Sequence, residues 1–215
     1  MVSYKNILAH VKKWEGGLVY FKTENQWTNQ GIQWTTYKAL APRLLGISNP
    51  TVDGLKALTR AQAEKFIEYF WNVATNNNSI TNQATANAFF EMLWGGGGYG
   101  IKWLQKVIGV YPDGRVGPKT VAAANAFPAS VLVDEVLKRY NSLAKSNPAK
   151  YGGVINGWRN RWNDLLIISK RYFQAMTEEL KKAVLNTKNK NKNISWVLPL
   201  GLFLGFLGYK KFIKK

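Results

Sequence analysis

Two glutamates near the N-terminus, Glu15 and Glu24, have the chemistry and the spacing needed to cleave a glycosidic bond. Glu15 comes directly after Trp14 and is followed by two glycines, and Glu24 lies nine residues further along the chain. In such cleavage one carboxyl group protonates the leaving oxygen, and a second group acts as a base or stabilises the oxocarbenium-like transition state. The glycines after Glu15 allow a bulky sugar to approach the backbone. The alternative for both residues is an exposed acid at a helix end or in a loop.

The side chains that follow Glu24 have the groups needed to bind a sugar. Thr28 and Asn29 carry a hydroxyl and an amide that can orient a water molecule or a substrate hydroxyl group. Trp27 and Tyr37 offer aromatic faces for stacking on sugar rings, although aromatic residues at this spacing are more often part of a hydrophobic core. We therefore treat Thr28 as a catalytic candidate and the other three as candidates for substrate binding.

The composition of the 215 residues excludes several other chemistries. There is no cysteine and only one histidine, His10. This excludes a Cys–His nucleophile and thiolate zinc sites, and it argues against zinc hydrolases, which use two or three imidazoles. A Ser-His-Asp triad would have to use His10 itself. The sequence therefore implies no metal ion and no cofactor.

The chain is strongly basic, with 30 Lys and Arg residues, 12 Asp and Glu residues, and a net charge of +18. Such a chain is expected to associate with polyanions or anionic surfaces. Half of the excess charge lies in the last 36 residues, which contain nine lysines and no acid. Lipid headgroups explain this half better than nucleic acid does, so we expect no nucleic acid partner.

A charge-free segment, residues 194–209, lies between lysine-rich flanks near the C-terminus. Its 16 residues would form a helix of about 24 Å. Extension to residue 213, with lysine side chains reaching back to the headgroups, gives a segment that can span a bilayer. We therefore predict a transmembrane anchor at residues 194–213, with a buried core helix as the alternative. Because lysines flank both ends, the orientation in the membrane stays open.

The periodicity of the apolar residues predicts a mainly α-helical protein. The first apolar stripe runs from Ile7 to Trp14; Ser3 would cap this helix and the two glycines would end it, which places Glu15 at the edge of a loop. The four glycines at 95–98 would end another helix and mark an internal boundary. Further helices are predicted at residues 35–45, 59–71, 82–94, 101–108, 118–126, 129–145 and 157–184, and a short hairpin within residues 18–36.

Two motifs in the N-terminal half, WEGGLVY and TNQGIQWTTY, resemble glycoside hydrolase family 108, a group of lysozyme-like muramidases common in phages and bacteria. The aromatic helix that ends at Trp71, and the segment from Phe90 to Gly96, occur where this family has an aromatic helix and a Phe-Asp-x-x-x-Asn-x-Gly pattern. In the second half, DGRVGPKTVAA, RYNSLAKSNPAKY and NGWRNRW resemble the small peptidoglycan-binding domain of the same family. The resemblance covers about residues 4–170.

The resemblance implies how the chain is divided. We expect a lysozyme-like helical catalytic domain at residues 1–94 and a small helical peptidoglycan-binding domain at residues 98–170. A helix end and basic linker would follow at residues 171–193, and then the transmembrane helix at residues 194–213.

The resemblance also assigns residues. It implies that Glu15 is the catalytic acid, and it adds Gln33 and Trp71 to the substrate-binding candidates. The family's loop after the Glu-Gly-Gly motif is rich in aspartate, whereas Glu24 is the only acid in this loop. The aspartate expected near the end of the first domain is replaced by Glu91, so the second catalytic carboxylate stays open. In the second domain the candidate wall-binding residues are Asp113, Gly114, Lys119, Trp158 and Arg161.

These observations predict a membrane-anchored muramidase that hydrolyses the β-1,4 bond between N-acetylmuramic acid and N-acetylglucosamine during phage lysis or infection. It would be held at a virion membrane or at the inner membrane of the host cell and would act on the cell wall. Its partners would be peptidoglycan, the lipid membrane through residues 194–213, and other virion proteins. One alternative is a lytic transglycosylase, which needs a single acid/base because the 6-hydroxyl group of the sugar is the nucleophile. Another is a non-catalytic wall-binding protein of a membrane-containing virion.

Overall fold

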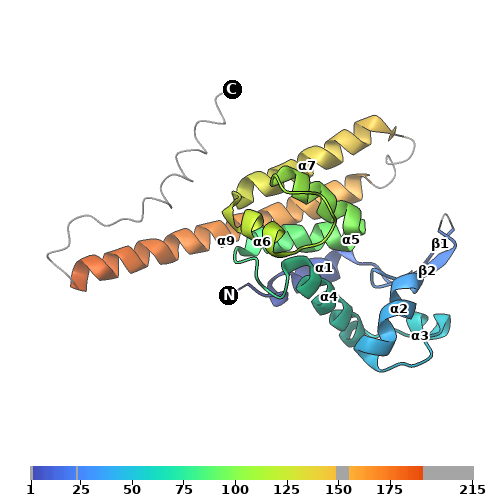
Figure 1. Cartoon of the computed structure of the whole chain (residues 1–215). Helices are drawn as coiled ribbons and strands as arrows, with labels where there is room; N and C mark the ends of the chain where they lie inside the picture. Colours follow the sequence, from blue (N-terminus) through green and yellow to red (C-terminus); the bar gives the residue numbers. More distant parts are fainter. Residues whose placement is uncertain (1, 23, 149–154, 191–215) are drawn as a thin grey trace. The chain divides into compact units, whose positions relative to one another are not determined.

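The structure, a computed structural model, describes residues 2–22, 24–148 and 155–190 (Figure 1). The chain divides into two compact units, Met1–Ile168 and Ser169–Lys215. The described part is mainly helical, as the sequence predicts. Its helices and strands are α1 (Lys5–Trp14), β1 (Val19–Phe21), β2 (Gln26–Asn29), β3 (Ile32–Gln33), α2 (Trp34–Leu45), α3 (Val52–Lys56), α4 (Arg60–Thr75), α5 (Gln83–Val107), α6 (Pro118–Ala126), α7 (Ala129–Ser146) and α9 (Ile155–Lys190).

The short hairpin predicted within residues 18–36 is a three-stranded antiparallel sheet in the order β1-β2-β3. Thr28 is opposite Val19 on one side and Gln33 on the other. The turn between β2 and β3 consists of Gln30 and Gly31, which both have positive φ angles, 52° and 78°. A two-residue turn of this kind matches the twist of the strands it joins. This turn sets the position of Gly31 beside α1.

The helix ends follow local signals in the sequence. Thr59 caps α4, because its side chain accepts from the Gln62 amide while the Gln62 side chain accepts from the Thr59 amide. At the start of α1 the structure corrects the prediction: Tyr4, and not Ser3, is the capping residue, and it makes no side-chain cap. The Ser3 hydroxyl still accepts a hydrogen bond from the Lys5 amide, at 3.3 Å.

The glycine run at residues 95–98 divides α5, as the sequence predicts, although the first helical segment extends beyond residue 94. α5 consists of two helices that meet at a kink at Gly97, where φ is 53° and ψ is −145°. The kink brings the two parts of α5 together so closely that a Cβ at Gly100 would lie 2.7 Å from the carbonyl carbon of Met92. The predicted domains 1–94 and 98–170 overlap one compact unit that ends at residue 168, and their boundary stays a prediction.

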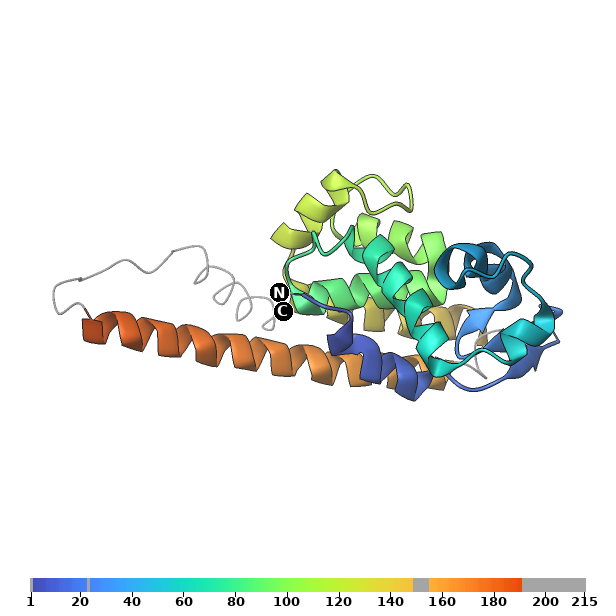
Figure 2. The ribbon, with the colours of Figure 1, turned by 90° about the horizontal axis from the view of Figure 1, so that it is seen from below.

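The first unit has two clusters of buried apolar side chains. The larger lies among α1, α4, α5, α6, α7 and the start of α9, and includes Trp71, Phe89, Phe90 and Trp162. The smaller joins the sheet to α2, α3 and α4 and is built from Ile32, Tyr37, Ala41, Leu55, Leu58, Ala63 and Phe66. Trp94 packs against both clusters. In both ribbon views α1 lies beside the beginning of α9 (Figures 1 and 2).

The second unit contains the remainder of α9, which continues to Lys190. The basic linker predicted at residues 171–193 is therefore helical as far as residue 190. The transmembrane helix predicted at residues 194–213 lies outside the described residues. Within the described ranges, no single helix is long and apolar enough to span a membrane. One pair of helices reaches that length and apolarity when counted together, namely α6 and the first part of α7, but the two are bent by 103° relative to each other.

Candidate active site

Glu15 lies directly after α1, and its carboxylate is held through one of its two oxygens. Oε1 accepts hydrogen bonds from the indole Nε1 of Trp94 and from Nη1 of Arg161, both at 2.6 Å. Oε2 has no hydrogen-bond partner among the described residues. The side chain is 16% exposed, so it is largely removed from water but still accessible. The carboxyl group is therefore fixed in place and has one oxygen available for chemistry.

Gly31 packs directly against this carboxyl group. A Cβ atom at this position would lie 2.6 Å from Cδ of Glu15, which is shorter than any normal contact. The φ angle of 78° also disfavours any residue with a side chain. The glycine of the TNQGI motif therefore allows the sheet to reach the catalytic candidate.

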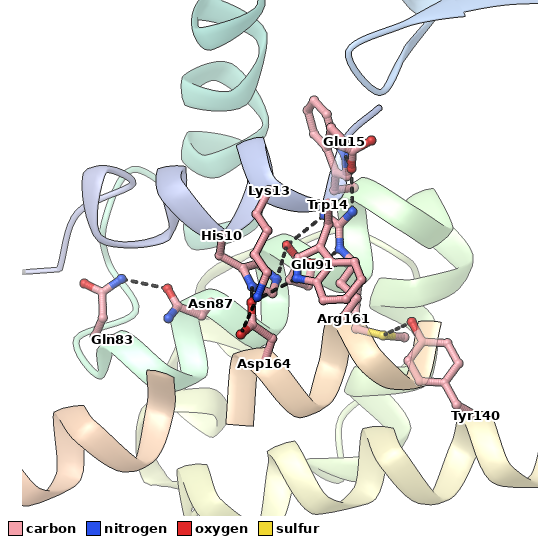
Figure 3. A network of polar contacts seen from close by, with 12 residues as sticks. His10, Lys13, Trp14, Glu15, Gln83, Asn87, Glu91, Tyr140, Arg161 and Asp164 are labelled. Atoms are coloured by element: carbon pink, nitrogen blue, oxygen red, sulfur yellow. Dashed lines mark hydrogen bonds and ion pairs between the residues drawn. The ribbon is translucent and has the colours of Figure 1, made fainter. Parts of the chain in front are cut away.

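Arg161, at the start of α9, joins Glu15 to a second carboxylate. Its Nε and Nη2 atoms donate to the two oxygens of Glu91, at 2.5 and 3.0 Å, while Nη1 binds Glu15 (Figure 3). Glu91 is 3% exposed, so its charge depends on this paired geometry. The prediction that Arg161 binds the cell wall is corrected, because all three donor groups of its guanidinium face carboxylates inside the unit.

His10 and Asp164 extend the network along α1. The Nδ1 atom of His10 lies 3.1 Å from Asp164, and Nε2 lies 3.5 Å from Glu91. Asp164 also accepts from the Trp14 indole at 2.9 Å and from Lys13 at 3.0 Å. Figure 3 shows these side chains between α1 and the start of α9. The two helices are thus joined by charged and polar contacts right up to Glu15.

Burial and neighbouring charges set the protonation of this network. Burial lowers the pKa of His10, although Glu91 raises it, so the imidazole is neutral near pH 7. Burial alone would lower the pKa of Arg161, but Glu91 and Glu15 outweigh it and raise the pKa above its ordinary value. Burial alone would raise the pKa of Asp164, but hydrogen bonds from Trp14, Lys13 and His10 lower it. The network therefore holds fixed charges around Glu15 over a wide pH range.

Glu24 lies in the loop between β1 and β2 and is exposed. Its Oε2 accepts from the side-chain amides of Gln26 at 3.0 Å and Gln33 at 2.9 Å. Gln33, a predicted substrate-binding residue, is thus brought to Glu24. Among the described residues, no hydrogen bond links Glu24 to Glu15.

Thr28 lies in the middle of β2 and is 7% exposed. Its hydroxyl group is buried and has no hydrogen-bond partner among the described residues. A buried hydroxyl without a partner is unfavourable by about 1–3 kcal/mol, so the position needs a reason beyond packing. A bound water molecule or a substrate hydroxyl group would supply the missing partner.

Two predicted substrate-binding residues make internal contacts near the site. The Asn29 amide donates to the carbonyl groups of Leu55 and Lys56, at 3.0 and 3.1 Å, and so ties β2 to α3. The half-buried Trp27 ring lies 5.2 Å from the Tyr20 ring and 4.8 Å from the Lys56 ammonium group. Asn29 holds the sheet in place, and the Trp27 ring already has two neighbours within the protein.

The structure corrects the assignment of Tyr37 and Trp71 to sugar binding. Each is 1% exposed, so neither ring has a free face. Tyr37 stacks with Phe66 at 6.1 Å, and the Trp71 indole donates to Asn78 at 2.6 Å. Both are core residues, which is the more common role of aromatic residues at this spacing.

A cleft of about 240 Å³ opens beside Glu15. Its other lining residues come from α1, from the loop after it, from the end of β2 and from α4, and they are Val11, Lys12, Gly16, Gly17, Asn29, Gln30, Arg60, Ala63 and Ile67. The two glycines leave the backbone open beside the carboxylate. Within the described ranges, no three His, Asp or Glu side chains are placed to share a metal ion.

The predicted wall-binding turn, Asp113-Gly114, is held from inside by Gln105. The Gln105 amide nitrogen donates to Asp113 at 2.7 Å, to the Arg115 carbonyl at 2.9 Å and to the Thr120 hydroxyl at 3.0 Å, and its oxygen accepts from the Gly114 amide at 2.8 Å. The bond from Gln105, followed by that from the Arg115 amide, lowers the pKa of Asp113. Gly114 has a φ of 83°. The DG turn is therefore a structural element.

The remaining wall-binding candidates are Lys119 and Trp158, and neither lines the cleft beside Glu15. Lys119 is exposed in the first turn of α6. Trp158 is half-buried and its ring lies 5.5 Å from that of Tyr140. Burial raises the pKa of Tyr140 to about 12.

The sequence analysis missed three residues that shape the site: Trp94, His10 and Asp164. Only His10 carried a signal, because it is the single histidine and lies on the apolar face of the first helix, four residues before Trp14. Trp94 and Asp164 are far from Glu15 along the chain, and nothing in their spacing points to it.

Two comparisons with known proteins find matches to this chain. Residues 99–163 match the family described as "Predicted Peptidoglycan domain". The structure is similar to that of SagA from Brucella abortus, with a TM-score of 0.65 and 25% sequence identity, over 79% of this chain and 94% of that chain. The comparison with curated proteins finds no match. These findings relate the protein to peptidoglycan.

Proposed function

We propose that this protein is a muramidase of the glycoside hydrolase family 108 type, encoded by a phage, with Glu15 as the general acid. The observation that carries the proposal is the Glu15 carboxyl group, which is fixed through Oε1 by Trp94 and Arg161 while Oε2 has no partner among the described residues. A general acid for glycosidic cleavage needs this combination of a fixed position and a free oxygen. The matched peptidoglycan domain at residues 99–163 supports the substrate.

Arg161 holds the two glutamates in different ways. Two carboxylates, Glu15 and Glu91, face one guanidinium. Arg161 binds Glu91 through two nitrogens and Glu15 through one. Both oxygens of Glu91 are therefore occupied, whereas Oε2 of Glu15 has no partner among the described residues. Glu91 acts as a support for the site and not as a second catalytic carboxylate.

The second catalytic role is assigned to the sheet. In hydrolysis a water molecule attacks the anomeric carbon, the glycosidic bond breaks, and the proton from Glu15 goes to the leaving oxygen. We assign the orientation of that water to the unpartnered hydroxyl group of Thr28 and its deprotonation to Glu24, which accepts a hydrogen bond from Gln33, the strand partner of Thr28. A lytic transglycosylase is the second candidate, because that reaction needs only one acid/base and Glu15 is firmly positioned with a free oxygen.

Mass spectrometry of the muropeptides released by the full-length protein tests the reaction. Reducing ends on N-acetylmuramic acid are the expected result and indicate hydrolysis. Anhydro ends would replace the muramidase proposal with transglycosylation. Reducing ends on N-acetylglucosamine would show cleavage of the other glycosidic bond. Absence of any cleavage, with intact binding to sacculi, would identify a non-catalytic wall-binding protein.

The place of action is proposed from the C-terminal sequence. Residues 194–213 would anchor the enzyme in a virion membrane or in the inner membrane of the host, with the basic flanks against anionic headgroups. Flotation with anionic liposomes should retain the full-length protein and release one that lacks residues 188–215. The truncated protein should still clear peptidoglycan suspensions. A truncated protein that floats with the lipid would contradict the anchor.

A further inference from the structure

A second cavity, of about 510 Å³, has none of the residues of the Glu15 cleft in its lining. It lies among α2, α4, α5 and the DG turn. Its floor is aliphatic, with Val73, Leu93, Ile101 and Val116. Its polar groups are two guanidinium groups, three amides and a phenol, from Arg43, Arg115, Asn72, Asn76, Asn77 and Tyr69. We call it the amide–arginine cavity. Its volume is in the range of small-ligand sites, about 300–1,000 Å³.

The cavity has two positive charges and no carboxylate in its lining. Arg43 lies over the Tyr69 ring, with 5.2 Å between the guanidinium carbon and the ring centroid. Within the described part of the chain, neither Arg43 nor Arg115 forms an ion pair. The Arg161 guanidinium, by contrast, is paired with two carboxylates, those of Glu15 and Glu91. The amide–arginine cavity therefore has two guanidinium groups available for an anion.

The three amide side chains of the cavity are also available. Asn72, Asn76 and Asn77 have no side-chain hydrogen bond to any described residue, whereas the next asparagine, Asn78, accepts from the Trp71 indole at 2.6 Å. The backbone amides of Asn76 and Asn77 both donate to the Asn72 carbonyl group. This turn holds three amide groups at one edge of the cavity.

The turn has an unusual backbone. Asn76, Asn77 and Asn78 have consecutive positive φ angles of 49°, 54° and 65°. Asparagine enters this left-handed region more readily than most residues, but each such residue is still less favourable than glycine there. Asn76 ends α4 and Asn78 binds Trp71, which explains two of the three. Among the described residues, no side-chain contact explains why position 77 is an asparagine. A side-chain amide that binds a ligand in the cavity would explain it.

We propose that the amide–arginine cavity binds a short peptide with free carboxylates, namely the peptide stem carried by peptidoglycan. The guanidinium groups pair with the carboxylates, the amides bond to peptide groups, and the aliphatic floor covers small side chains such as alanine. The substrate class rests on the proposed function. The site itself rests on the cavity, its free donors and its charge.

Isothermal titration calorimetry of the full-length protein with a free stem tetrapeptide tests this site. The Arg43→Gln/Arg115→Gln variant should bind about tenfold or more weakly, because two charge-assisted pairs are lost. Lys38→Gln/Lys106→Gln removes the same charge from exposed positions outside the cavity and should bind as the unchanged protein does. Asn77→Gly should weaken binding about threefold while keeping or raising the melting temperature, because glycine accepts the backbone conformation.

Four results would overturn the proposal. The first is the absence of tetrapeptide binding to the unchanged protein. The second is equal weakening by the two double variants, which would show non-specific attraction. The third is unchanged affinity for a tetrapeptide whose carboxylates are esterified. Tighter binding of a polyol-phosphate oligomer than of the tetrapeptide would likewise overturn it in favour of a phosphate ligand.

The test does not depend on catalysis. The free tetrapeptide contains no glycosidic bond, and the Glu15→Gln variant should bind it with unchanged affinity. A protein that binds the tetrapeptide but releases no muropeptides would refute the proposed function and leave the cavity assignment standing. A protein that cleaves glycan but does not bind the tetrapeptide would refute the cavity assignment and leave the proposed function standing.

Discussion

The cluster around Glu15 and the cluster around Gln105 are both polar and partly buried, and each contains residues that the sequence marks as functional. They differ in how their hydrogen bonds are used. Gln105 is neutral, and its amide nitrogen and oxygen both have partners within the protein. The Glu15 cluster is charged, and it leaves Oε2 of Glu15 without a partner among the described residues. The hydroxyl group of Thr28, in the sheet whose turn contacts Glu15, has no partner there either. The first arrangement stabilises a turn, and the second keeps unfilled positions that a substrate can occupy.

The substitution Glu15→Gln should have the largest effect on wall lysis and tests this comparison most directly. The amide keeps the shape but cannot donate a proton in the same way, so wall lysis should fall by about 10²–10⁴-fold. Arg161 keeps its pairing with Glu91, so the melting temperature should change little. Turbidity clearing of purified sacculi and circular dichroism measure the two effects. Normal clearing by the folded variant would remove Glu15 from the mechanism.

Gly31→Ala should have the next largest effect. The new methyl group would displace the Glu15 carboxyl group, and lysis should fall by about 10–100-fold, because misplacement by about 1 Å has that effect on catalysis. Gly46→Ala is the matched control, because Gly46 has a φ of 71° and nothing within 4 Å of the added Cβ. Both variants should lose similar stability, about 1–2 kcal/mol, but only Gly31→Ala should lose activity. Equal activity in the two would refute the role of this contact.

Thr28→Val tests the unfilled hydroxyl group. Valine has the same shape, so lysis should fall by about tenfold through loss of the oriented water, while stability should stay equal or increase because an unpaired buried hydroxyl is removed. Turbidity assays measure the lysis and chemical denaturation measures the stability of Thr28→Val. A less stable Thr28→Val protein with full activity would make the hydroxyl structural.

Glu24→Gln should reduce lysis substantially but incompletely in the turbidity assay, since its neighbours Gln26 and Gln33 remain polar.

Gln105→Met should show the opposite pattern. Loss of the amide leaves buried partners around the DG turn without bonds, so the free energy of unfolding should fall by about 2–4 kcal/mol. Lysis per folded molecule, measured well below the melting temperature, should stay within about twofold of the unchanged protein. A stable Gln105→Met protein that no longer sediments with sacculi would instead make the turn a wall-binding element.

The smallest effect is a pH dependence of stability from His10. Because burial lowers its pKa in the folded state, the unfolded chain binds more protons, and stability falls as the pH drops below the unfolded value of about 6.5. The slope is at most about 1.4 kcal/mol per pH unit. His10→Gln should remove this slope and leave the acid-induced loss below about pH 4, which comes from groups such as Asp164 whose pKa is lowered. An identical slope in both proteins would exclude His10 as its source.

The sequence predicted the elements better than it predicted the contacts between them. Capping by Thr59 and the DG turn follow from neighbouring residues, so local rules found them. Glu15 was found by its motif. The pairing of Arg161 with Glu15 joins residues 146 positions apart and has no local signature, so Arg161 was assigned to the wall. The glycines at 95–98 predicted the break in α5 at Gly97, but the close approach of Gly100 to the Met92 backbone joins residues across the break and has no local signature.

The reach of Arg161 back to Glu15 also sets an order of events during synthesis. The ribosome makes α1 and the sheet first, but the guanidinium that holds Glu15 is added 146 residues later. Until residue 161 has left the ribosome, the nascent chain carries Glu15 and Glu91 without the cation that joins them. Closing a contact of such long range is slow compared with forming local helices. The arrangement around Glu15 is therefore complete only after nearly all of the first unit, which ends at residue 168, has been translated. Under the proposed function, the nascent chain would stay inactive until that point.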